Sequence, residues 1–66
     1  MTIGNRIAEL RKAKGFTQEY VADQLGVSRQ AVSKWENGTS DPSTGNLLAL
    51  AKLYGMNAAE LLQGIQ

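Results

Sequence analysis

The sequence predicts an all-α fold: a compact five-helix bundle that forms a single domain over residues 1–66. Three observations support this prediction. Apolar residues recur at the three- and four-residue spacing of a helix along most of the chain. Glycine or proline interrupts that spacing at short intervals. No segment sustains the two-residue alternation of apolar and polar residues that is typical of a half-buried strand.

The first two helices have recognisable signals at both ends. The first begins after Thr2 and stops at Gly15. The second covers residues 18–25, between Thr17 and Gly26. Threonine before a helix can accept a hydrogen bond from the free amides of the first turn, and glycine after it can take the left-handed conformation that ends the helix.

The other three helices follow after short breaks. The third covers residues 28–37, and the fourth covers residues 43–55, directly after Pro42. Proline disfavours helix in the residue before it, so the fourth helix cannot start earlier. The fifth begins at Asn57, where Glu60 stands three residues on as the partner of a capping box.

The composition excludes several classes of protein. The chain has no Cys and no His, so we expect no disulfide, no metal site of the usual kinds and no cofactor. No apolar run approaches the length of about 18 residues that a membrane span requires. Charged residues interrupt the apolar ones near the N-terminus, unlike a secretory signal. We therefore expect a cytoplasmic protein without a membrane partner.

The charge is unevenly distributed along the chain. Residues 1–34 hold six Lys and Arg against three Asp and Glu, whereas residues 35–66 hold one against three. The first half is therefore where an anionic partner would bind. An ordinary solvated mosaic of charges is the alternative interpretation.

The stretch "GVSRQAVSKWENG" separates polar from apolar side chains on one helix. At about 100° per residue, one face holds the polar set Arg29, Gln30, Ser33, Lys34 and Asn37. The opposite face holds Ala31, Val32 and Trp35. A solvated helix surface usually mixes carboxylates with cations, but this polar face has no Asp or Glu. Its groups suit guanine, adenine and phosphate, so the face indicates nucleic-acid binding.

The two helices at residues 18–25 and 28–37 have the arrangement of a helix-turn-helix. A short turn that contains Gly26 separates them. Ala22 is small where the first of the pair would approach the second. Apolar residues that would hold the two helices together are Val21, Leu25, Val27, Val32 and Trp35.

From about Ile3 to Leu62, the sequence resembles the DNA-binding domain of the phage repressor and Cro-like (XRE-type) helix-turn-helix family. The segment "TQEYVADQLGVSRQAVSKWENG" resembles the family's helix-turn-helix throughout. A proline, a capping Ser43 and "LLALAKLYG" resemble its fourth helix. The family has a five-helix, lambda repressor-like fold, which agrees with the number of helices counted above.

The resemblance implies roles for individual residues. The third helix would lie in the major groove. Its base-reading set would be Arg29, Gln30, Ser33 and Lys34. The phosphate-contacting set would be Gln18, Ser28, Asn37, Thr39 and Ser43. The family also commonly pairs Arg11 with Glu36, which makes these two a structural ion pair.

Two residues depart from the family's pattern. Tyr20 stands where many relatives have Glu, so the second helix relies on Thr17 alone for its cap. Asp41 stands in a loop where many relatives have cations, so the grip on the DNA backbone should be weaker there.

We therefore expect a sequence-specific double-stranded DNA-binding domain of a transcriptional regulator, a repressor in the first instance, and not an enzyme. Binding to a palindromic operator would require a homodimer. The C-terminal helix would form its interface through Met56, Leu62 and Ile65, unless these residues only cover the core. The rival interpretation is a protein-interaction module of the same fold, such as an antitoxin or an oligomerisation domain.

Overall fold

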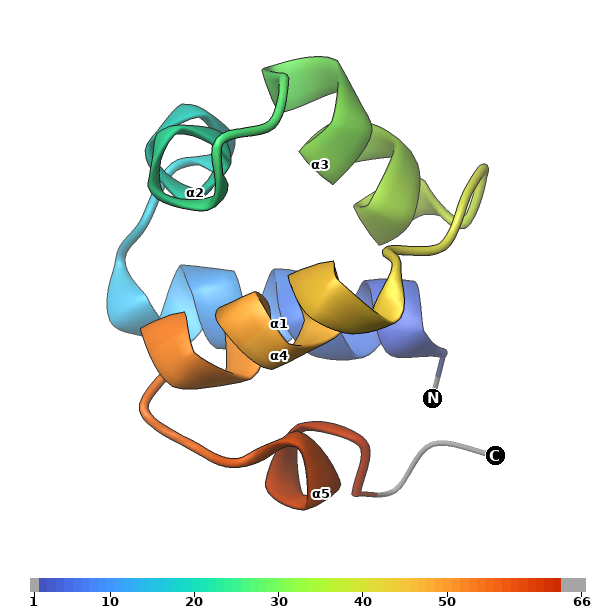
Figure 1. Cartoon of the computed structure of the whole chain (residues 1–66). Helices are drawn as coiled ribbons and strands as arrows, with labels where there is room; N and C mark the ends of the chain where they lie inside the picture. Colours follow the sequence, from blue (N-terminus) through green and yellow to red (C-terminus); the bar gives the residue numbers. More distant parts are fainter. Residues whose placement is uncertain (1, 64–66) are drawn as a thin grey trace.

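A computed structural model describes residues 2–63, and these fold into five helices (Figure 1). In chain order the helices are α1 (Ile3–Lys14), α2 (Gln18–Leu25), α3 (Arg29–Asn37), α4 (Thr44–Leu53) and α5 (Ala58–Leu61). Residues 2–63 contain no strand. The predicted all-α, five-helix fold is confirmed.

Each helix begins after a polar residue that caps it. The capping residues are Thr2, Thr17, Ser28, Ser43 and Asn57. Each has extended backbone, and its side-chain oxygen accepts a hydrogen bond from the amide three residues on. Only α5 has the full capping box, because Glu60 bonds back to the amide of Asn57.

The helix ends follow the predicted glycines, with one exception. Gly26 and Gly38 end α2 and α3 in the left-handed conformation, at φ +71° and +84°. In contrast, α4 ends at Leu53, two residues before the predicted end at Gly55. There the chain turns because Gly55 itself takes a left-handed φ of +76° and its amide bonds to the carbonyl of Lys52.

The core lies between the helix-turn-helix pair and the other helices. In Figure 1, α2 and α3 lie above α1 and α4, and α5 lies below them. The buried core consists of Ile7, Val21, Ala22, Val32, Trp35, Leu50, Ala51, Tyr54 and Leu61. Every helix contributes to it. Leu25 and Val27 are only partly buried and pack against this core.

The first helix approaches the third very closely. Gly4 is buried, and a Cβ added to it would lie 2.5 Å from the carbonyl oxygen of Trp35 and 2.8 Å from that of Glu36. Only glycine leaves room for this contact. The start of α1 therefore packs directly against the backbone of the C-terminal half of α3.

Two absences hold for residues 2–63. No helix there has the length and apolar character to span a bilayer. That part of the chain also has no group of three or more His, Cys, Asp or Glu placed to hold a metal ion.

Candidate nucleic-acid interface

The predicted base-reading set lies together on the outer face of α3. Arg29, Gln30 and Lys34 are exposed, and Ser33 is partly buried. These four side chains line a shallow hollow of about 210 Å³. The opposite face of α3 anchors the helix, because Val32 and Trp35 are buried in the core. The helical period therefore correctly predicted which face of α3 is exposed and which face packs against the core.

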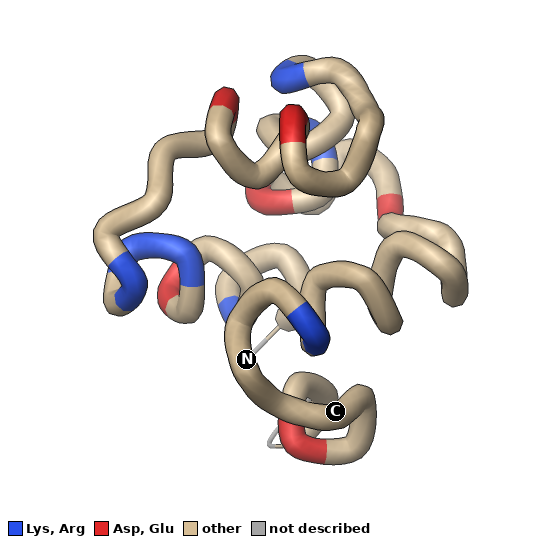
Figure 2. The backbone as a smooth tube through the Cα atoms, turned by 60° about the vertical axis from the view of Figure 1, so that its left-hand side comes forward, with Lys and Arg blue, Asp and Glu red and all other residues tan. Residues whose placement is uncertain are grey.

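Cations are spread over several elements, as Figure 2 shows. Two of the six in residues 1–34 are engaged with protein groups. Arg6 donates to the carbonyls of Leu61 and Glu60, at 3.0 and 2.9 Å. Arg11 pairs with Glu36. The basic half of the chain therefore offers fewer cations to a partner than its composition indicates.

Arg11 and Glu36 form a two-pronged ion pair between α1 and α3. Arg11 Nε donates to Glu36 Oε2 at 2.7 Å, and Arg11 Nη2 donates to Glu36 Oε1 at 3.1 Å. The side chains are only 13% and 9% exposed. The hydrogen bond to Glu36 raises the pKa of Arg11 above its ordinary value. Arg11 Nη1 also donates to the carbonyl of Phe16, which fixes the segment between α1 and α2.

Gln18 has a partner that the sequence did not predict. Its Nε2 donates to Glu36 Oε1 at 3.0 Å, so its amide is hydrogen-bonded within the protein. Gln18 is the first residue of α2 and is partly buried. An amide nitrogen has two N–H groups, so one donor is left for a ligand.

The other residues predicted to contact phosphate differ in the donors they keep. Ser28 and Ser43 accept the capping bonds of α3 and α4 through their oxygens, which leaves each hydroxyl proton for a ligand. Thr39 instead donates its hydroxyl proton to Asn37 Oδ1. Asn37 is exposed and keeps its two amide N–H groups at the end of α3. Asn37 is therefore better placed to donate to phosphate than Thr39.

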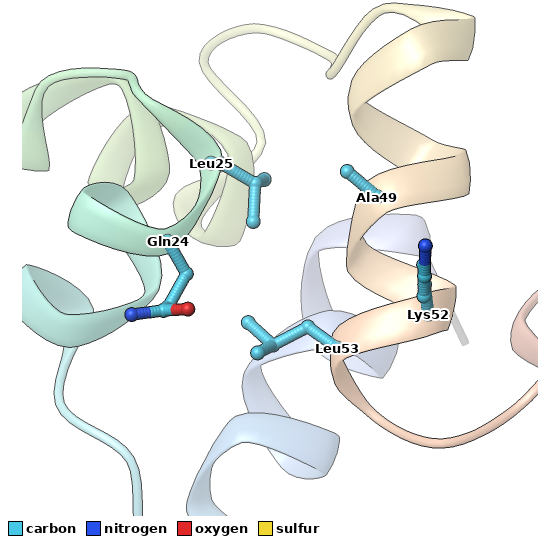
Figure 3. Close-up of a pocket in the computed structure, with 5 residues that line it drawn as sticks. All are labelled: Gln24, Leu25, Ala49, Lys52 and Leu53. Carbon is cyan, nitrogen blue, oxygen red and sulfur yellow. The ribbon is translucent and has the colours of Figure 1, made fainter.

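A groove between α2 and α4 lies outside the predicted contacts with DNA. Figure 3 shows its lining residues, which are Gln24, Leu25, Ala49, Lys52 and Leu53. Its volume is about 260 Å³. No member of the base-reading or phosphate-contacting sets lines it, so these residues offer matched positions for control substitutions.

The fold and this surface define a class of protein. Two capped helices joined by a short turn present one polar, carboxylate-free helix face to solvent, which is the arrangement of a helix-turn-helix domain. A family model described as "Helix-turn-helix" matches residues 7–61, and the chain belongs to this family. The resemblance inferred from the sequence is confirmed.

Curated relatives are transcriptional regulators and not enzymes. The transcriptional activator BcrR of Enterococcus faecalis is 41% identical over 64 residues, which are 97% of this chain and 31% of BcrR. The transcriptional regulator DicA of Escherichia coli is also 41% identical over 64 residues, which are 97% of this chain and 47% of DicA. The chain thus spans less than half the length of either relative.

Solved structures agree with this family. The P22 c2 repressor in complex with a synthetic operator has a TM-score of 0.87 at 36% identity, with 97% of each chain covered. SinR, a master regulator for biofilm formation, in complex with DNA has a TM-score of 0.84 at 28% identity. That match covers 94% of this chain and 100% of the other.

Proposed function

We propose that this chain is a single sequence-specific double-stranded DNA-binding domain of a transcriptional regulator, acting in the cytoplasm. The observation that carries the proposal is the exposed face of α3, which offers guanidinium, amide, hydroxyl and ammonium groups and no carboxylate. Glu36, which borders this face, is neutralised by Arg11. The operator complex of the similar P22 c2 repressor supports the same interpretation.

The proposed binding mode places α3 in the major groove. Arg29 and Lys34 suit guanine O6 and N7, and Gln30 suits adenine N6 and N7. Ser33 can donate to a base edge or a phosphate. The remaining N–H of Gln18, the hydroxyls of Ser28 and Ser43 and the amides of Asn37 would hold flanking phosphates.

A homodimer on a palindromic operator would bring two such helices into successive major grooves, about 34 Å apart. Leu62, directly after α5, is 43% exposed and could form part of the dimer interface. Met56 instead packs against the core, which supports a covering role for this residue. Ile65, the third residue expected in the interface, lies outside the described residues.

Selection from a random pool of DNA duplexes tests the function. The parent should enrich one motif, and a dimer should enrich a palindrome. Replacing Arg29 and Gln30 together by Ala should abolish discrimination between the enriched motif and random DNA, because base contacts carry the sequence information. The melting temperature should stay unchanged, since both side chains are exposed.

The matched control is Gln24→Ala with Lys52→Ala, which removes an amide and a cation from the groove between α2 and α4. The control should discriminate as the parent does. Undiminished discrimination by the Arg29 and Gln30 double variant would show that α3 does not read the bases.

A protein-interaction module is the second candidate function. A complex of SinR with the protein SinI has a TM-score of 0.85 at 28% identity to this chain, so a domain of this fold occurs in a protein that binds another protein. This candidate predicts no enriched motif in the selection. The two functions are therefore separated by the same experiment.

A further inference from the structure

We propose that Glu36 is a positioning residue for DNA binding, in addition to its structural pairing with Arg11. The inference rests on the proposed function. Glu36 would orient the side-chain amide of Gln18, so that an N–H group and not the amide oxygen meets a DNA phosphate at the start of α2.

The carboxylate of Glu36 is itself held in place. Arg11 donates to both of its oxygens, at 2.7 Å to Oε2 and 3.1 Å to Oε1. The side chain is 9% exposed. Because a partly buried, two-pronged pair with Arg has a defined geometry, Oε1 offers a fixed acceptor to the residues around it.

Gln18 uses that acceptor. Its Nε2 lies 3.0 Å from Glu36 Oε1, although the two residues belong to different helices. A glutamine amide can turn over and exchange its oxygen for its nitrogen, and the two ends have opposite character as donors. A carboxylate accepts only from the nitrogen end. The bond to Glu36 therefore selects one orientation of the amide.

The selected orientation matters at the start of a helix. The cap residue Thr17 accepts from the amide of Tyr20, so the backbone amides of Gln18 and Glu19 have no cap bond from it. Such amides favour a phosphate. The second N–H of the Gln18 side chain adds a donor beside them, whereas a turned amide would bring its oxygen towards the phosphate and weaken binding.

The same network links the phosphate contact to the base-reading helix. Glu36 is on α3, Gln18 begins α2 and Arg11 is on α1. The position of the Gln18 donor is thus tied to α3 through one carboxylate. A phosphate bound at Gln18 would help to set the register of α3 in the groove.

A double-mutant cycle on DNA affinity tests the proposal. The variants are Gln18→Ala, Glu36→Gln and the two combined, measured on the motif that the parent selects. Gln18→Ala should weaken binding by about tenfold, which is typical for one hydrogen bond to a charged group. Glu36→Gln should weaken parental binding by about fivefold, yet have less than about a twofold effect when Gln18 is already Ala.

A purely structural Glu36 gives a different result. The effects of Glu36→Gln would then be the same with and without Gln18, and this additivity would overturn the proposal. Glu9→Gln, an exposed carboxylate on α1, is the matched control and should bind as the parent does. Where Glu36→Gln melts below the temperature of measurement, Glu36→Asp replaces it, because it keeps the charge for Arg11 and withdraws the acceptor from Gln18.

A spectroscopic measurement needs no DNA. In the parent, one of the two side-chain amide protons of Gln18 should exchange slowly with solvent, and its NMR signal should be displaced from the position of a free glutamine amide, because that proton is bonded to Glu36. Both features should be lost in the Glu36 variant. Signals in the parent at the positions of a free amide, with fast exchange, would overturn the inference. If the parent selects no motif, the proposed function is wrong and this inference fails with it. If the parent binds a motif but the mutant cycle is additive, only this inference is wrong.

Discussion

Gly4 and Gly45 allow a residue-scale test of close packing, because each is the second residue of its helix. A Cβ at Gly4 would collide with the carbonyl oxygens of Trp35 and Glu36, whereas at Gly45 the nearest atom is 4.0 Å away. Gly4→Ala should lower the free energy of unfolding by about 1–3 kcal/mol, as overpacking does. Gly45→Ala should raise it by up to about 1 kcal/mol, because alanine favours helix. Urea denaturation measures both.

Each glycine variant is the control for the other, because both replace glycine by alanine at the second position of a helix. Equal effects of the two substitutions would mean that helix propensity, and not the contact between α1 and α3, decides the outcome at Gly4.

Tyr54 is buried at 2% exposure, and within residues 2–63 its hydroxyl has no hydrogen-bond partner. A buried hydroxyl without a partner costs free energy. Tyr54→Phe should therefore raise the free energy of unfolding by about 1 kcal/mol at neutral pH. Thermal melting measures it, and Tyr20→Phe, at an exposed tyrosine, should change little. A lower melting temperature for Tyr54→Phe would imply a partner for the hydroxyl.

Alkaline pH should increase the difference between Tyr54→Phe and the parent. Burial is the main cause that raises the pKa of Tyr54 from 10.0 to about 12, and the negative charge of Glu36 raises it further by a smaller amount. The folded state holds the hydroxyl proton of Tyr54 more tightly than the unfolded state does. The stability of the parent that depends on this proton is therefore fully present below about pH 10 and is lost as the pH rises towards about 12. The advantage of the Phe variant should therefore grow over that range, and an advantage independent of pH would contradict the burial.

At the scale of elements, α5 depends on a side chain from α1. This helix has only four residues, and Arg6 donates to the carbonyls of Glu60 and Leu61 at its C-terminal end. A cation there also interacts favourably with the helix dipole. Arg6→Met should therefore increase hydrogen exchange of the Leu61 and Leu62 amides by about tenfold, with less effect in α2 and α3.

Lys12→Met removes an exposed cation from the same helix and is the control for Arg6→Met. It should leave exchange in α5 unchanged. Equal protection in the parent and in the Arg6 variant would mean that the capping box and Leu61 alone hold α5.

Helix starts could be predicted from the sequence because a cap is a local feature. Thr17, Ser28 and Ser43 each bond to an amide three residues away, and the residues that make such bonds are few. The polar face of α3 could be predicted for a similar reason, since its members recur with the helical period. Local rules of this kind cover most of the fold and the position of the predicted base-reading residues on one face of α3.

Long-range partners could not be predicted in this way. Arg6 donates to Glu60 and Leu61, which are 54 and 55 positions further along the chain. The space beside Gly4 is filled by the backbone of another helix. The side-chain amide of Gln18 is suited to bind a phosphate, but its bond to Glu36 depends on how α2 and α3 cross. These features follow from tertiary packing, which no short pattern in the sequence describes.

At the scale of the whole molecule, some of the positively charged side chains are bonded within the protein and are not free to bind DNA. Arg6 and Arg11, on α1, are bonded to protein groups. The polar face of α3 carries two cations, Arg29 and Lys34. Each neutralised phosphate contributes about −0.9 to the slope of log affinity against log salt. We therefore expect a slope of about −2 for one domain and about −4 for a dimer on a palindrome.

The slope can be assigned to residues by substitution. Lys34→Gln should reduce it by about 1 for each bound domain, because one phosphate or groove charge is lost. Lys52→Gln, at the groove between α2 and α4, removes the same charge outside the proposed interface and should leave the slope unchanged. Fluorescence anisotropy on the selected motif between low and moderate salt measures all three proteins. An equal reduction by both variants would show that the protein binds DNA through its overall charge and not through the face of α3.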